Sequence, residues 1–111
     1  MVNIFALDIG GTKIACGIYD ENLNLIREWK VPTGKGLSDI EGAVLKSCRR
    51  ACEEVEIAAV GISAAGNIKP DRRTIAFSTN IPCWIDYPLA EIIEDEFKIP
   101  VIVENDANAA G

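Results

Sequence analysis

Three runs of strand-forming residues follow one another at the start of the chain with very short segments between them. Residues 2–9 are apolar, and residues 13–19 and 23–31 alternate between apolar and polar side chains. The two segments between the runs are turn-forming, with two glycines at 10–11 and Asp-Glu-Asn at 20–22. Because parallel neighbours need long crossovers, these runs predict three antiparallel strands.

A helix and a buried strand are expected next. Ser38 and Glu41 have the pattern of a capping box, with Ser38 as the N-cap and Glu41 reaching back to it. An apolar stripe at helical spacing follows, made of Ile40, Val44, Cys48, Ala51, Cys52 and Val55. Residues 57–62 then predict a strand that a right-handed crossover places parallel to one already in the sheet.

The rest of the chain adds a second helix and a third buried strand. Asp86 and Pro88 are expected to open the helix, and residues 100–103 form the strand, with another helix starting at Asn105. The fold class is therefore α/β. We expect a mixed five-stranded sheet, with three antiparallel and two added parallel strands, and helices on its faces.

Composition limits the class of protein. The chain has 111 residues, enough for one domain, and a net charge of −6, which argues against nucleic acid or an anionic membrane as a partner. No apolar run approaches the ~20 residues of a membrane span. The N-terminus lacks the basic region of a signal peptide, so a cytoplasmic protein is expected.

The four cysteines, Cys16, Cys48, Cys52 and Cys83, form no Cys-x-x-Cys pair, and the chain contains no histidine. Small thiols buried in the core are therefore expected, rather than a metal site built from these residues.

Three segments should meet although they lie far apart in the sequence. Residues 8–13, 63–67 and 104–106 each follow a buried strand. In open α/β sheets, ligands bind beyond the carboxyl ends of the parallel strands. We therefore expect these segments to line one site.

The first of these segments suits a phosphate group. Gly10 and Gly11 let the backbone approach closely, and their amides can form a concave nest. Thr12 adds a hydroxyl group and Lys13 a positive charge, while Asp8 can hold Mg²⁺ through water. The alternative is a plain glycine hairpin in which Asp8 accepts hydrogen bonds from the turn amides.

The other segments suit a substrate with hydroxyl groups. Asp106 can cap a helix, or it can accept the proton of an attacking hydroxyl beside a phosphate site. Asn105 can both donate and accept hydrogen bonds, which suits adjacent hydroxyls. Gly66 permits close backbone approach, and Ser78 and Asn80 add polar groups.

Three other features have simpler interpretations. Trp84 suits either an apolar sugar face or the edge of the core. Residues 70–73 predict a surface turn whose two arginines form a solvated tip, and residues 74–77 predict a short strand.

Four motifs together resemble the ROK sugar kinases, glucokinase-like proteins of the actin-like ATPase superfamily. They are residues 8–13, 61–66, 78–84 and 104–110, in the order of the family and at roughly its spacing. The resemblance implies a ribonuclease-H-like fold and phosphorylation of a hexose or amino-hexose by ATP and Mg²⁺.

The resemblance also implies roles for individual residues. Asp106 corresponds to the catalytic base, and Asn105, Asn80 and Ser78 correspond to sugar contacts. The turn at 10–13 corresponds to the first phosphate loop.

Two departures from the family are visible. Ala65 stands where the family often has proline, so this loop is expected to be less rigid. Family members are also much longer, so residues 1–111 are expected to be the N-terminal domain of a larger, homo-oligomeric protein. The resemblance places the rest of the nucleotide site, further sugar ligands and any zinc motif in the absent C-terminal domain. The 111-residue piece alone is therefore expected to be inactive.

Two other functions compete with the kinase. ROK members also include sugar-sensing regulators with an added N-terminal DNA-binding domain, for which a chain starting at the first strand leaves no room. Another actin-like ATPase is the third possibility, and the segments 80–84 and 105–106 speak against it.

Overall fold

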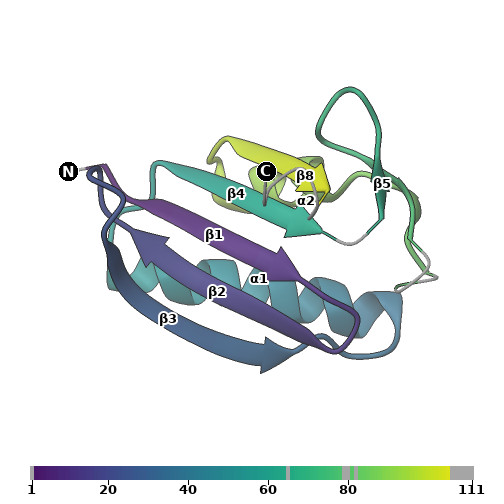
Figure 1. Ribbon diagram of the computed structural model, residues 1–111, viewed down its shortest axis with the longest axis horizontal. Helices are drawn as coiled ribbons and strands as arrows, with labels where there is room; N and C mark the ends of the chain where they lie inside the picture. Colours follow the sequence, from purple (N-terminus) through teal and green to yellow (C-terminus); the bar gives the residue numbers. More distant parts are fainter. Residues whose placement is uncertain (1, 65, 79–80, 82, 106–111) are drawn as a thin grey trace.

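A five-stranded mixed sheet forms the centre of the molecule, in the order β3-β2-β1-β4-β8 (Figure 1). The computed structural model describes residues 2–64, 66–78, 81 and 83–105, the last by its backbone alone. The strands of this sheet are β1 (Ile4–Ile9), β2 (Lys13–Tyr19), β3 (Leu25–Pro32), β4 (Ala59–Ala64) and β8 (Val101–Asn105). β1, β2 and β3 pair antiparallel, and β4 and β8 add in parallel. The expected sheet is therefore confirmed.

Both helices pack on one face of this sheet. Arg49 of α1 (Leu37–Glu54) forms an ion pair of 3.6 Å with Glu96 of α2 (Leu89–Phe97) and lies over the ring of Phe97. Every second residue of the central strands is buried, and these residues form the core with the apolar stripes of the helices: Phe5, Leu7, Ile9, Ile14, Cys16, Ile18, Val60, Ile62, Val101 and Val103. Each large apolar side chain buried in this way stabilises the fold by about 1.5–3 kcal/mol.

The opposite face of the sheet carries mostly small side chains. We call it the open face, and its members on β1, β2, β4 and β8 are Ile4, Ala6, Asp8, Ala15, Gly17, Tyr19, Ala59, Gly61, Ser63, Ile102 and Glu104. In the part of the chain that the structure describes, no helix covers this face. Ile102, on the edge strand β8, is consequently 54% exposed.

A second, three-stranded sheet was not expected. It consists of β5 (Asn67–Ile68), β6 (Ile75–Phe77) and β7 (Ile85–Tyr87), in the order β5-β6-β7 with antiparallel pairing. Only β6 matches an expected strand. The other two are too short to show the alternation of side chains from which a strand is predicted.

The predicted capping box is wrong. Gly36 is the N-cap of α1, so Ser38 lies inside the first turn and no side chain caps the helix. Glu41 instead accepts a hydrogen bond of 2.6 Å from the hydroxyl group of Tyr87, which is 7% exposed. Burial, with the nearby Glu41 carboxylate, raises the pKa of Tyr87. A buried phenol needs an acceptor, and it takes the carboxylate that the box would have used.

The other differences concern where elements begin. β4 starts at Ala59 and α2 at Leu89, with Pro88 as its N-cap. Asp86, expected to open α2, lies in β7 and forms an ion pair of 2.9 Å with Lys69. Leu23, expected in a strand, lies in a turn with a φ of 64° and is 71% exposed.

The turn at residues 69–74 is tied to α2. The carboxylate of Asp71 accepts hydrogen bonds from the amides of Arg73 and Thr74, at 2.8 and 3.0 Å. Arg73 donates two bonds, of 2.7 and 2.6 Å, to the carboxylate of Glu94, which also accepts the amide of Val101. These contacts lower the pKa of Glu94 to about 2, and the hydrogen bond from Arg73 has the largest effect. The expected solvated tip is therefore wrong for Arg73.

This pairing predicts a pH dependence of stability. The pKa of Glu94 is about 2 in the folded state, against an ordinary 4.5, so its contribution is complete above pH 4.5 and is lost as the pH falls towards 2. In Glu94→Gln we expect a lower urea midpoint than in the parent at pH 7, with the difference shrinking between these pH values. Glu96→Gln, at an exposed ion pair, is the control and should keep the parental profile. If the difference in urea midpoint between Glu94→Gln and the parent stayed constant from pH 4.5 to pH 2, the contribution of the ionised Glu94 to stability would be contradicted.

Gly66 predicts a second effect on stability. Its φ is +129°, and a Cβ built on it would lie 2.5 Å from the carbonyl oxygen of Phe77. We expect Gly66→Ala to lower the free energy of unfolding by about 2 kcal/mol or more. An alanine is strained at this φ, and its Cβ would collide with the backbone carbonyl of Phe77. Gly42→Ala is the matched control, because Gly42 lies in α1 and a Cβ added there meets no atom within 4 Å. It should be stabilising by about 0.5–1 kcal/mol in the same urea titration.

Candidate functional site

The carboxyl ends of the three parallel strands form one straight row. Ile9 of β1 is paired with Ala64 of β4, and Ala64 is paired with Asn105 of β8. The arrowheads of these strands point the same way in Figure 1. The expected convergence is therefore confirmed for the strand ends from which residues 8–13, 63–67 and 104–106 depart.

One residue earlier, the row carries three polar side chains on the open face. Asp8 is paired with Ser63, and Ser63 is paired with Glu104. With neighbouring strands about 4.8 Å apart, Asp8 and Glu104 lie roughly 10 Å apart on either side of the serine. Asp8 is exposed, and its carboxylate has no hydrogen bond or ion pair among the described residues. The alternative in which Asp8 accepts the turn amides is therefore wrong.

The turn after Asp8 uses one of its own amides. The amide of Gly10 donates a hydrogen bond of 2.9 Å to the carbonyl of Lys13, so it is not free for a phosphate, contrary to the nest expected from both glycines. Gly11, Thr12 and Lys13 are exposed, and no ion pair of Lys13 exists within the described ranges. A positive side chain and two backbone amides thus remain available at the rim of the open face.

Thr33 braces this turn and was missed by the sequence analysis. It is fully buried; its hydroxyl donates a hydrogen bond of 2.8 Å to the carbonyl of Gly10, and its amide donates one of 3.0 Å to the carbonyl of Thr12. The two bonds tie the turn to the end of β3. The only sequence signal is a threonine directly after an expected strand, which is too common to single out.

Gly66 and Ser78 lie against each other. A Cβ on Gly66 would come within 2.9 Å of the Cβ of Ser78. The segment that approaches this glycine closely is therefore another part of the same chain, at Ser78. Ser78 is 6% exposed, and its hydroxyl oxygen accepts the amide of Ile81 at 3.1 Å. That hydroxyl still has a proton to donate to a ligand.

Several expected site residues lie outside the described part. They are Asn80, Asp106 and the side chain of Asn105. Asp106 directly follows the last residue of β8, one position past the row of strand ends.

Trp84 belongs to the core. Its side chain is fully buried and stacks on Tyr87, with 5.9 Å between the ring centroids. Of the two interpretations, the core edge is therefore the right one, and the ring is not presented to a sugar. Its indole N–H has no acceptor among the described residues.

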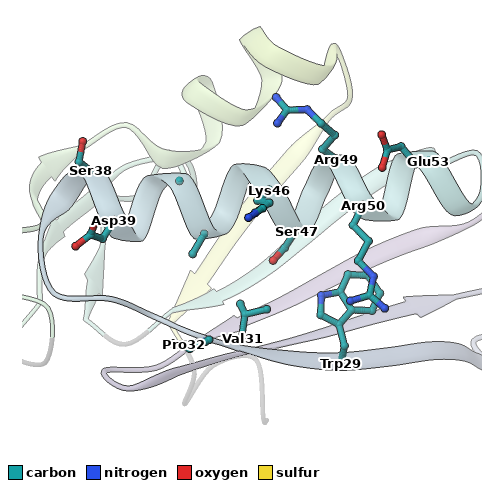
Figure 2. Close-up of a pocket in the computed structure, with 12 residues that line it drawn as sticks. Trp29, Val31, Pro32, Ser38, Asp39, Lys46, Ser47, Arg49, Arg50 and Glu53 are labelled. Atoms are coloured by element: carbon teal, nitrogen blue, oxygen red, sulfur yellow. The ribbon is translucent and has the colours of Figure 1, made fainter.

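A groove of about 920 Å³ lies between α1 and β3 (Figure 2). Arg50 of α1 lies over the ring of Trp29, 4.2 Å from its centroid, and partly closes one end. β2 separates β3 from β1, and none of the expected site residues lines the groove. It is therefore a separate feature from the row of strand ends.

Two of the four cysteines are core thiols, and Cys52 and Cys83 are half-buried. Cys16 and Cys48 are buried, and burial is the main cause that raises the pKa of Cys48 to about 12. Among the residues that the structure describes, no cluster of three potential ligands for a metal exists. Within the same residues, no helix is long and apolar enough to cross a membrane.

Comparisons with known proteins show the family and the fold to which this chain is similar. The chain is 46% identical over 104 residues to a glucokinase of Streptomyces coelicolor, covering 94% of this chain and 32% of that protein. Its structure is similar to that of a ROK family glucokinase from Streptomyces griseus in complex with glucose and AMPPNP, with a TM-score of 0.89 and 41% identity, covering 97% and 34% of the two chains. A ROK hexokinase from Thermus thermophilus gives a TM-score of 0.86 and 38% identity, with 97% and 36% covered.

The chain thus spans about a third of the length of these relatives. The expected ribonuclease-H-like fold of an actin-like ATPase is confirmed by the two kinase structures. The model of the ROK family matches residues 4–111, and this chain belongs to that family.

Proposed function

We propose that this chain is the N-terminal domain of an ATP-dependent kinase that phosphorylates a hydroxyl group of a hexose or amino-hexose. Family membership and the likeness to sugar kinases support this proposal. The observation that carries it is the row of strand ends. The Asp8 carboxylate, without a partner among the described residues, lies one residue before the β1 end of this row, and Asn105 of β8, which Asp106 follows in the sequence, forms its other end.

The phosphate groups of ATP would bind at the turn after β1. The exposed amides of Gly11 and Thr12 and the ammonium group of Lys13 provide donors for phosphate oxygens. The exposed carboxylate of Asp8, which has no partner in the described part of the chain, fits Mg²⁺ held through water, since this ion prefers one or two carboxylates together with phosphates and water. When bound, Mg²⁺ neutralises charge on the phosphates.

The sugar would bind at the end of β8. Asn105, Asn80 and Ser78 hold its hydroxyl groups, and Gly66 keeps the backbone close beside Ser78. Asp106 accepts the proton of the attacking sugar hydroxyl while the oxygen of that hydroxyl forms a bond to the γ-phosphorus of ATP. The bond between that phosphorus and the bridging oxygen breaks, and ADP leaves. Most of the rate then comes from positioning the two substrates.

The remaining parts of the site belong to the same proposal. The rest of the nucleotide site, further sugar ligands and any zinc motif would lie downstream of Gly111, in a whole protein that is a homo-oligomer in the cytoplasm. The 111-residue chain alone would give no turnover.

The role of Asp106 predicts the effect of removing its carboxylate. In the whole protein, we expect Asp106→Ala and the shape-preserving Asp106→Asn to lower kcat by about 10² to 10⁴-fold, because the hydroxyl proton loses its acceptor. Sugar phosphorylation and thermal unfolding are measured together, and the melting temperature should stay near that of the parent. Asp95→Asn, at an exposed position of α2, is the control and should keep parental activity. Turnover of the Asp106 variants near the parental rate would remove this residue from the role of base.

The reaction class is tested by ADP release from the whole protein with a panel of hexoses and amino-hexoses. We expect release that depends on the sugar and is at least tenfold above the rate without sugar, about 1.4 kcal/mol in barrier height. Sugar binding without turnover would instead indicate a sugar-sensing regulator. Hydrolysis independent of sugar would indicate another actin-like ATPase.

A further inference from the structure

The outer edge of β8 is held by residues that come from elsewhere in the chain. β8 is the last strand of its sheet, so only one of its edges pairs with a strand, β4. On the other edge, the amide of Val101 donates to the carboxylate of Glu94 at 2.9 Å. The amide of Val103 donates to the carbonyl of Arg72 at 2.8 Å.

Arg72 makes a second contact one residue further along the strand. Its Nε lies 3.1 Å from Oε1 of Glu104, so its carbonyl and its guanidinium hold two consecutive residues of β8. The side chain of Arg72 is 67% exposed, as expected of a solvated turn, but its guanidinium also forms this ion pair.

The backbone of Arg72 is shaped for this contact. Its φ is 57°, in the left-handed region that is unfavourable for a residue with a side chain. Its own amide donates to the carbonyl of Lys69 at 2.9 Å, and Asp71 fixes the next two amides of the turn. The turn is thus held in a conformation that directs the carbonyl of Arg72 at Val103.

The ion pair of Arg72 and Glu104 contributes little to the stability of the fold. An ion pair with one partner so exposed contributes little, because water screens it and two long side chains must be ordered. Its place is more informative than its strength. Glu104 is the second-last residue of β8, and Asn105 and Asp106 follow it directly in the sequence.

We propose that Arg72 is a positioning residue for the sugar-phosphorylating reaction. By holding Val103 through its carbonyl and Glu104 through its guanidinium, it fixes the direction in which the chain leaves β8. Asn105 and Asp106 are the next two residues, so their approach to the sugar hydroxyl depends on this direction. The inference rests on the proposed function of Asp106, and displacements of about 1 Å at a reacting group can cost up to 10²-fold in rate.

The test compares variants in the whole protein. Arg72→Gly removes the guanidinium but keeps the carbonyl and suits the left-handed backbone, whereas Arg72→Lys keeps the charge. Glu104→Gln removes the partner charge independently. We expect kcat to fall about tenfold in Arg72→Gly and in Glu104→Gln, with KM for MgATP within about twofold and little change in melting temperature. Arg72→Lys and the charge-reversed pair Arg72→Glu with Glu104→Arg should recover most of the lost kcat.

Arg27 provides a matched control. It pairs with Glu54 at 3.4 Å, with side-chain exposures of 57% and 27% that resemble the 67% and 29% of Arg72 and Glu104, but it lies on β3. Arg27→Gln should leave kcat unchanged. Parental kcat in both Arg72→Gly and Glu104→Gln, with Asp106→Asn inactive, would overturn the positioning role and leave the proposed function standing. The positioning role would also be overturned if kcat fell only in proportion to a lowered melting temperature and charge reversal did not restore it. Full activity of Asp106→Asn would instead reject the proposed function, and the inference with it.

Discussion

The parallel pairing of β1, β4 and β8 is the constraint on which the site depends. Hydrogen bonding between these strands fixes Ile9, Ala64 and Asn105 in one row, although the first two are 55 positions apart in the sequence and the last two 41. A shift of a strand by one residue would move Asp8 or Glu104 to the helix-covered face. The apolar alternation that buries Phe5, Leu7 and Ile9 therefore also decides which face carries the polar side chains.

Small structural contacts hold each end of this row. Thr33 ties the turn after β1 to the end of β3, while the turn at 69–74 holds β8 through Arg72 and through Arg73 with Glu94. Each brace comes from a loop that carries none of the expected site residues. These two loops therefore contribute contacts that hold the strand ends in place.

The main sheet could be predicted because its signals are local and repeated. Alternating side chains defined the strands, and short turns excluded parallel pairing among the first three. The capping box failed because its carboxylate could also serve Tyr87, which is distant in sequence.

The same limit explains what was missed at the site. The hydrogen bond within the turn at Gly10, the brace from Thr33 and the ion pair of Arg72 all depend on which atoms meet in the folded chain. Trp84 remained ambiguous because an aromatic ring suits a sugar and a core equally well. Patterns of residue type predicted which strand ends meet, whereas the contacts that support them required coordinates.

The open face, which no helix covers within the described residues, offers a place for a reporter. A Cβ added at Gly61 meets no atom within 4 Å, so a compact fluorophore attached there through an introduced cysteine would leave the core undisturbed. Position 61 lies two residues before Ser63 on the same strand and the same face. The emission of such a probe would register directly whether this side stays wet or becomes dry when substrates are added.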